Sequence, residues 1–218
     1  EEKKRCLDML HRAIARMQPV ERDHDGFATV VDEAQVAFIK PGYIKLLASK
    51  QGPFPRRQDL KPQGLHVGKV PPGRIFSVSH GWASEMHPSP SGATLRRLAK
   101  KLAKLDAHDE DDGVFLDYCS LSQKAHNVPP VYEEVTGAVL PQVDRTPHEV
   151  RQFRFAMWEM SRMYAYERCE VIVLPVLDEV RTTHIDVNGA QQSLWGRVNP
   201  IAYENRGWVS PMRLEPPF

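Results

Sequence analysis

The stretch IFSVSHGW, residues 75–82, decides the fold. Its first five residues, 75–79, follow Pro-Pro-Gly and are followed by His80 and Gly81, a pattern that predicts a short β-strand. Two further apolar runs, 114–118 and 171–174, predict a second and a third strand. The third run is apolar at every position, which is typical of a strand buried on both faces of a parallel sheet.

Amphipathic segments separate these three runs. In the first segment, four leucines recur at helical spacing and predict a helix with one apolar side, which we call the leucine seam: Leu95, Leu98, Leu102 and Leu105. The second opens with TPHE, residues 146–149, which predicts a capping box with proline at the first helical position, and its apolar residues continue at 3-4-3-4 spacing to Tyr164. The order strand–helix–strand–helix–strand with long crossovers predicts the α/β fold class, with helices flanking a parallel sheet.

The chain divides into a predicted α/β domain at residues 71–218 and an N-terminal extension at residues 1–70. Apolar spacing in residues 7–17 predicts a helix. The pattern of residues 33–50 is ambiguous, and residues 52–73, rich in proline, glycine and arginine, predict an irregular connector packed along the domain.

The outer face of the predicted helix at 95–105 is basic, and the acidic run 106–112 follows it directly. One interpretation is a surface that binds phosphate or an acidic partner. The other, which we favour, is a solvated helix face whose charge the neighbouring acids neutralise. The basic residues are Arg96, Arg97, Lys100, Lys101 and Lys104.

Composition excludes several classes of protein. The 218 residues include 29 Lys+Arg and 28 Asp+Glu, a net charge of +1 that argues against general nucleic-acid binding. The longest apolar stretch, 171–177, is too short to cross a membrane. Three cysteines without a CxxC pair favour a reducing, cytoplasmic location. The chain begins at Glu1 without a signal-peptide pattern, and we expect it to be part of a longer protein.

Polar and aromatic side chains follow the first two predicted strands. Parallel α/β sheets bind ligands beyond the carboxyl ends of their strands, so we expect a substrate-binding site there. Trp82 is either a stacking face for a purine or nicotinamide ring or a plug in the core. Asp117 is either hydrogen-bonded structurally or part of the site, and His80 is either an acid/base or a structural residue. The candidate substrate-binding residues at the strand ends are Ser79, His80, Gly81, Trp82, Asp117 and Tyr118.

Several familiar chemistries lack their sequence patterns. The chain has no GxGxxG after a strand, no GxxxxGK[ST] loop and no GxSxG nucleophile elbow. A metal site built from His80, His87, Asp117 and Cys119 matches no known ligand spacing, so we predict no bound metal.

Six strings in the chain are PRRQDL at 55–60, VSHGW at 78–82, HPSPSG at 87–92, VFLDYCSLSQ at 114–123, RTP at 145–147 and YENRGW at 203–208. Together they resemble a group of TIR-like proteins from algae and protists, with the patterns VSHxW…HPDPxG, VFxDYxSLxQ and YxxRGW. More distantly they resemble TIR domains and fungal heterokaryon-incompatibility domains. The resemblance covers roughly residues 53–215.

This resemblance implies a flavodoxin-like fold and two alternative functions. Some TIR domains cleave the nicotinamide–ribose bond of NAD⁺ in signalling or innate immunity, as hydrolases or cyclases. For these, NAD⁺ is the substrate and no cofactor is permanently bound. Other TIR domains are non-catalytic modules that assemble with one another through protein–protein contacts. Self-association is expected in both cases.

The resemblance also implies where a catalytic glutamate belongs. In the enzymatic members it lies four residues after a tryptophan, and it would stabilise an oxocarbenium-like transition state. Trp208 matches that tryptophan and joins the substrate-binding candidates, but Met212 occupies the fourth position after it. Glu215 and Glu204 are therefore the candidate catalytic carboxylates, and neither is in register. The alternative role for both is an ordinary surface carboxylate.

Overall fold

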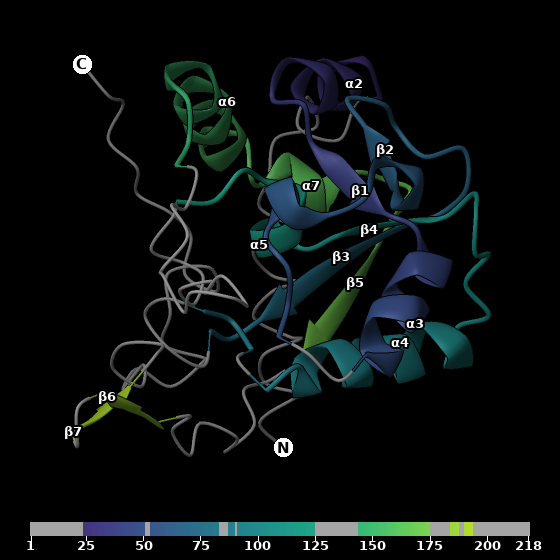
Figure 1. Ribbon diagram of the computed structural model, residues 1–218. Coiled ribbons are helices and arrows are strands. Elements are labelled where there is room, and N and C mark those ends of the chain that lie inside the picture. The colour runs from purple at the N-terminus through teal and green to yellow at the C-terminus, as the bar shows by residue number, and fades with distance from the viewer. Residues whose placement is uncertain are drawn as a thin grey trace.

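The computed structural model describes residues 24–50, 53–82, 87–89, 91–124, 144–174, 184–187 and 190–193 (Figure 1). The strands are β1 (Ala37–Ile39), β2 (Leu65–Val67), β3 (Ile75–His80), β4 (Gly113–Phe115), β5 (Cys169–Leu174), β6 (His184–Val187) and β7 (Ala190–Ser193). The α-helices are α2 (His24–Glu33), α3 (Pro41–Ser49), α4 (Ala93–Lys104), α5 (Asp117–Ser120), α6 (Pro147–Trp158) and α7 (Arg162–Ala165). Two 3-10 helices, η2 (Arg57–Asp59) and η3 (Pro62–Gly64), precede β2.

Five strands form one sheet in the order β2-β1-β4-β3-β5. β3 pairs in parallel with β4 on one side and with β5 on the other. β1 is antiparallel to both β4 and β2. The α/β class and the parallel arrangement of the three predicted strands are therefore confirmed. β6 and β7 form a separate antiparallel pair.

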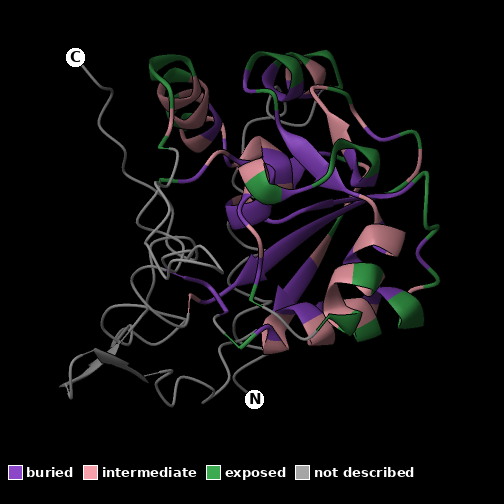
Figure 2. Ribbon diagram, in the orientation of Figure 1, coloured by how far each residue is buried: buried purple, intermediate pink, exposed green. Residues whose placement is uncertain are grey.

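Helices cover both faces of the sheet, as Figure 1 shows. Strand residues alternate between two hydrophobic clusters because successive side chains of a strand point to opposite faces. Phe76 and Val78 pack with the leucines of α4, on the face that α3 also covers. Ile75 and Phe115 pack on the other face, against α2, α6 and α7. All of β3 is buried, and Figure 2 shows the buried strands lying between the helical layers.

The capping box predicted for α6 is confirmed. The Thr146 hydroxyl accepts a hydrogen bond from the Glu149 amide at 3.2 Å, and the Glu149 carboxylate accepts one from the Thr146 amide at 2.8 Å. The predicted continuous helix is instead two helices, because α6 ends at Trp158 and α7 begins at Arg162. The apolar spacing persists across the break, since Met160 and Met163 both remain buried in the same cluster.

The predicted second strand is too long at its carboxyl end. β4 stops at Phe115, and the chain turns into α5 at Asp117. The Ser120 hydroxyl accepts a hydrogen bond from the Leu116 amide at 2.9 Å, and the Ser120 amide donates to the Leu116 carbonyl at 2.8 Å. These local bonds replace the sheet ladder, which is how serine and aspartate commonly end regular structure.

The segment before residue 71 contributes two strands to the sheet. β1 lies in the stretch whose pattern is ambiguous, and β2 lies within the stretch predicted to be an irregular connector. Both strands have only three residues, which is too short to show a reliable alternation. Their pairing with each other and with β4 places this segment against the domain core.

The acidic run that follows α4 makes ion pairs outside that helix. Glu110 pairs with Lys40 at 2.8 Å, Asp109 with Lys45, and the buried Asp112 carboxylate with Arg74 at 3.0 Å. The acids of this run therefore engage α3, its N-cap and the start of β3. The two interpretations of the basic α4 face stay predictions.

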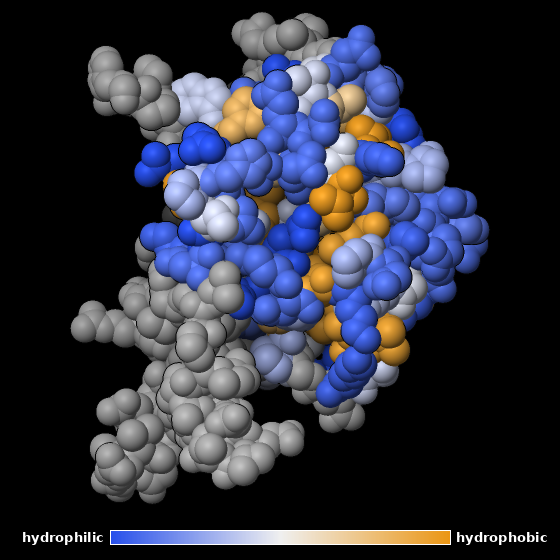
Figure 3. All heavy atoms as spheres, turned by 45° about the horizontal axis from the view of Figure 1, so that its top comes forward, coloured by the Kyte–Doolittle hydropathy of each residue, from blue (hydrophilic) through white to orange (hydrophobic). Residues whose placement is uncertain are grey.

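The face drawn in Figure 3 is largely hydrophilic and is crossed by a broken band of apolar atoms. Among the described residues, the large apolar side chains that remain exposed are Leu46, at 51%, and Trp158, at 44%. No helix in this described part of the chain has both the length and the apolar character needed to cross a membrane.

We expect Leu98→Ala to lower the free energy of unfolding by about 2–5 kcal/mol, because Leu98 is fully buried between α4 and the sheet. The matched control is Leu46→Ala on α3, which should change stability by no more than about 0.5 kcal/mol because this leucine is half exposed. Urea unfolding followed by circular dichroism measures both. Equal effects of the two substitutions would contradict the assignment of the core.

Candidate functional site

The carboxyl ends of β3 and β4 bring His80, Trp82 and Asp117 together. The two strands are parallel, so the last residue of β3 and the first residue of α5 lie at the same edge of the sheet. His80 Nε2 donates to Asp117 Oδ1 at 3.1 Å, and Trp82 Nε1 donates to Asp117 Oδ2 at 3.4 Å. The structure thus joins three of the predicted site residues through one carboxylate.

Asp117 is held as a charged acceptor. Burial alone would raise its pKa, but hydrogen bonds from His80, the Tyr118 amide and Trp82 outweigh burial and keep the pKa below its usual value. The Tyr118 amide donates to Oδ1 at 2.6 Å. Both carboxylate oxygens are therefore engaged, and Asp117 is suited to positioning its neighbours rather than to accepting a proton from a substrate.

His80 is the residue at this edge with an unmet hydrogen-bonding need. Its side chain is only 2% exposed, and Nε2 is directed to Asp117. Among the described residues, nothing forms a hydrogen bond with His80 Nδ1, which is also buried. Buried polar atoms are nearly always paired, so this nitrogen is the atom of the cluster that is available to a further polar group.

Trp82 and Tyr118 belong partly to the core. The Trp82 ring meets the Tyr118 ring edge-on, with centroids 5.5 Å apart. Tyr118 is fully buried, and this burial raises the pKa of its hydroxyl. Trp82 itself is half-buried and packs against the cluster that contains α4. Its contacts agree with the plug role, while its indole N–H contributes to the Asp117 cluster.

The remaining predicted site residues differ in what the structure describes. Ser79 and Gly81 are buried on either side of His80. The two candidate catalytic carboxylates, Glu204 and Glu215, lie outside the described residues, as does Trp208. Within the described ranges, no group of three or more histidine, cysteine, aspartate or glutamate side chains is arranged to hold a metal ion.

The segment 55–58, to which the sequence patterns assigned no functional role, contacts the residues at this edge. Gln58 and Gln123 exchange two hydrogen bonds: the side-chain Nε2 of Gln58 donates to the Gln123 backbone carbonyl at 2.8 Å, and the Gln123 backbone amide donates to Gln58 Oε1 at 3.1 Å. Gln123 Nε2 also donates to the Asp117 carbonyl at 3.3 Å. The Cys119 thiol donates to the Pro55 carbonyl at 3.2 Å. The signal available in the sequence was the PRRQDL string quoted with the resemblance.

His87 ties the next loop to the same segment. Its Nε2 donates to the Phe54 carbonyl at 2.9 Å, and its Nδ1 accepts from the Ser89 amide at 3.0 Å. These partners require the neutral ring with the proton on Nε2. The side chain is completely buried, and this burial lowers the pKa of His87 to about 4. Its ring also packs on Tyr118, so His87 is structural.

The lowered pKa of His87 predicts that the stability of the fold depends on pH. In the unfolded chain, His87 binds a proton below its ordinary pKa of about 6.5. In the folded protein, His87 binds this proton only below about pH 4. The free energy of unfolding should therefore fall by about 3 kcal/mol from this group as the pH drops through that range. His87→Gln keeps a donor for the Phe54 carbonyl and should remove this part of the pH dependence, as urea unfolding at several pH values would measure.

The matched control is His148→Gln, at an exposed position near the start of α6, which should leave the pH dependence unchanged. An unchanged pH dependence in His87→Gln would show that His87 titrates normally in the folded protein.

In comparisons with known proteins, no protein-family model, curated protein or solved structure matches the chain.

Proposed function

We propose that this chain is a TIR-like, nucleotide-binding domain of the flavodoxin-like kind that cleaves the nicotinamide–ribose bond of NAD⁺. The strand order supports this proposal. Taken alone, the three parallel strands lie in the order second-first-third, β4-β3-β5, which is the order that opens a flavodoxin-like sheet. In such sheets the ligand lies at the carboxyl edge, where the order reverses between the first and third strands. His80 ends the strand at that point.

The observation that carries the proposal is the meeting of His80 and Trp82 on the Asp117 carboxylate. The pairing fixes an aromatic ring and an imidazole beside the expected nucleotide position. The buried Nδ1 of His80, for which the described residues offer no hydrogen bond, supplies a polar contact for a ligand.

The proposed reaction breaks the bond between ribose C1′ and the nicotinamide nitrogen. The bonding electron pair leaves with nicotinamide, and water adds its hydroxyl group to C1′, so the products are nicotinamide, ADP-ribose and one proton. A glutamate carboxylate, Glu204 or Glu215, would stabilise the positive charge that develops on the ribose. Asp117 would hold Trp82 and His80 in place, and we place this activity in the cytoplasm, in signalling or defence.

The alternative is a non-catalytic TIR-like module that acts by assembling with other copies. One observation favours it: the carboxylate that contacts Trp82 among the described residues is Asp117, whose two oxygens are already bonded. A site closed by its own side chains serves packing better than catalysis.

We expect purified protein to release nicotinamide from NAD⁺, measured by chromatography both in solution and crowded on beads. One of Glu204→Ala and Glu215→Ala should abolish release, because only one carboxylate can face the ribose. The matched control is Glu33→Ala, at an exposed position at the end of α2, which should retain full turnover. Absence of nicotinamide in both formats, from folded protein, would exclude NAD⁺ cleavage by this chain and leave the assembly module.

We expect Asp117→Asn to reduce turnover about tenfold or more while the protein stays folded. Asparagine keeps the shape but replaces one acceptor oxygen with a donor, so either His80 or Trp82 loses its hydrogen bond. Because Asp117 positions groups that would contact the nucleotide, KM should change as well as kcat. Normal kinetics in a folded Asp117→Asn variant would show that this cluster is purely structural.

A further inference from the structure

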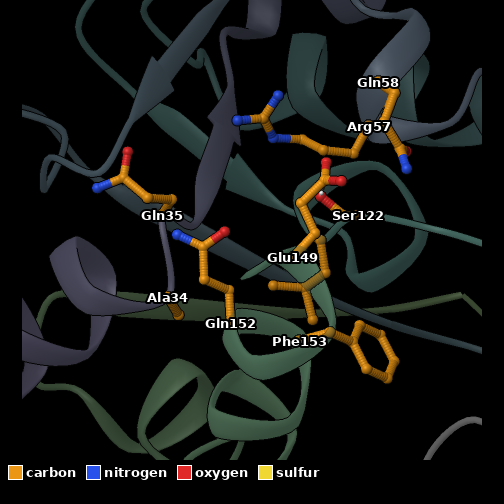
Figure 4. Close-up of a pocket in the computed structure, with 9 residues that line it drawn as sticks. Ala34, Gln35, Arg57, Gln58, Ser122, Glu149, Gln152 and Phe153 are labelled. Atoms are coloured by element: carbon orange, nitrogen blue, oxygen red, sulfur yellow. Dashed lines mark hydrogen bonds between the residues drawn. The ribbon is translucent and has the colours of Figure 1, made fainter. Parts of the chain in front are cut away.

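A pocket of about 110 Å³ lies beside the Asp117 cluster, where four segments of the chain meet (Figure 4). They are the end of α2, the 3-10 helix η2, the stretch after α5 and the first turns of α6. A pocket of this size suits a ligand with few heavy atoms. The side chains that define its chemistry are those of Arg57, Ser122, Glu149 and Gln152.

Arg57 brings a partly desolvated positive charge into this pocket. Burial lowers the pKa of its guanidinium, and the charge of Glu149 partly offsets that effect. Within the described part of the chain, no hydrogen bond or ion pair to the Arg57 guanidinium is formed. A guanidinium held away from water favours a planar anionic acceptor that can take two of its N–H groups.

Glu149 brings a negative charge to the same pocket. Its carboxylate accepts hydrogen bonds from the Thr146 amide at 2.8 Å and from the Ser122 hydroxyl at 3.1 Å. The bond from the Thr146 amide is the largest of the effects that hold the pKa of Glu149 below its usual value, so the group is ionised at neutral pH. These hydrogen bonds hold the Glu149 carboxylate toward the first turn of α6.

The two opposite charges do not touch. Figure 4 shows the Arg57 and Glu149 side chains entering the pocket from different elements, with Gln152 beside them. They interact through space, yet no ion pair joins them in the described structure. A simple anion at Arg57 would be repelled by Glu149, and a simple cation at Glu149 would be repelled by Arg57. A molecule that carries both charges can place its negative group at Arg57 and its positive group at Glu149, so the two attractions offset these repulsions.

We propose that this pocket binds a small zwitterion, a free α-amino acid with a short side chain, with its carboxylate on Arg57 and its ammonium group toward Glu149. The Gln152 amide, which forms no hydrogen bond with other described residues, can contact either end. The turn that follows α2, at Ala34 and Gln35, also lines the pocket, and the negative end of the α2 dipole beside it favours the ammonium group. This site is separate from the proposed NAD⁺ site and does not depend on that activity.

The first test uses the unmodified protein. Isothermal titration calorimetry should detect glycine, L-alanine or L-serine binding with a Kd of about 1 mM or tighter. Acetate and methylammonium, which each carry one of the two charges, should bind at least about tenfold more weakly. Equal binding of acetate would overturn the proposal in favour of a simple anion site. No binding of any of the three amino acids would overturn it entirely.

The second test assigns the binding to this pocket. Arg57→Gln and Glu149→Gln should each weaken amino-acid binding at least about tenfold, and glutamine at position 149 keeps a side chain that can complete the capping box. Arg154→Gln is the matched control, because this arginine is exposed on the same helix outside the pocket. Unchanged binding in both pocket variants, with folding verified by circular dichroism, would place the ligand elsewhere and overturn the proposal.

Discussion

β3 is buried along its whole length, and this constraint organises the rest of the structure. Its first three residues pair with β4 on one side, and all six pair with β5 on the other. Its side chains alternate between the two faces, so apolar helices must cover both. The one polar residue among its first four, Ser77, is accommodated because its hydroxyl donates to the Met163 carbonyl and accepts from the Cys169 thiol.

The same strand explains why a polar cluster forms at the carboxyl edge. The carboxyl ends of the parallel strands β3 and β4 lie at one edge of the sheet, so His80 meets the first residue of α5 at a place with little water. A carboxylate there is tolerated only when donors surround it, and Asp117 has three of them in His80, Trp82 and the Tyr118 amide. The Asp117 carboxylate therefore has its hydrogen-bond donors without a ligand, which agrees with either proposed function of the domain.

The hydrogen-bonded pair Gln58 and Gln123 contacts both candidate sites. Gln123 contacts the Asp117 carbonyl with its side chain and exchanges backbone and side-chain hydrogen bonds with Gln58. Gln58 in turn lines the pocket that Arg57 enters. The Arg145 guanidinium, 3.5 Å from the centre of the Phe153 ring, holds the outer side of α6 near the same pocket. A short chain of hydrogen bonds therefore connects the two sites.

The sequence by itself determined the three parallel strands, the leucine seam of α4, the capping box of α6 and the placement of His80 and Asp117 at one edge of the sheet. These features follow from local periodicity or from the rule that parallel strands end at one edge. Only the tertiary structure decided the rest. β1 and β2 are too short to show a period, and their strand character comes from pairing. Arg57 and Glu149 lie far apart in the chain, and packing alone makes them walls of one pocket.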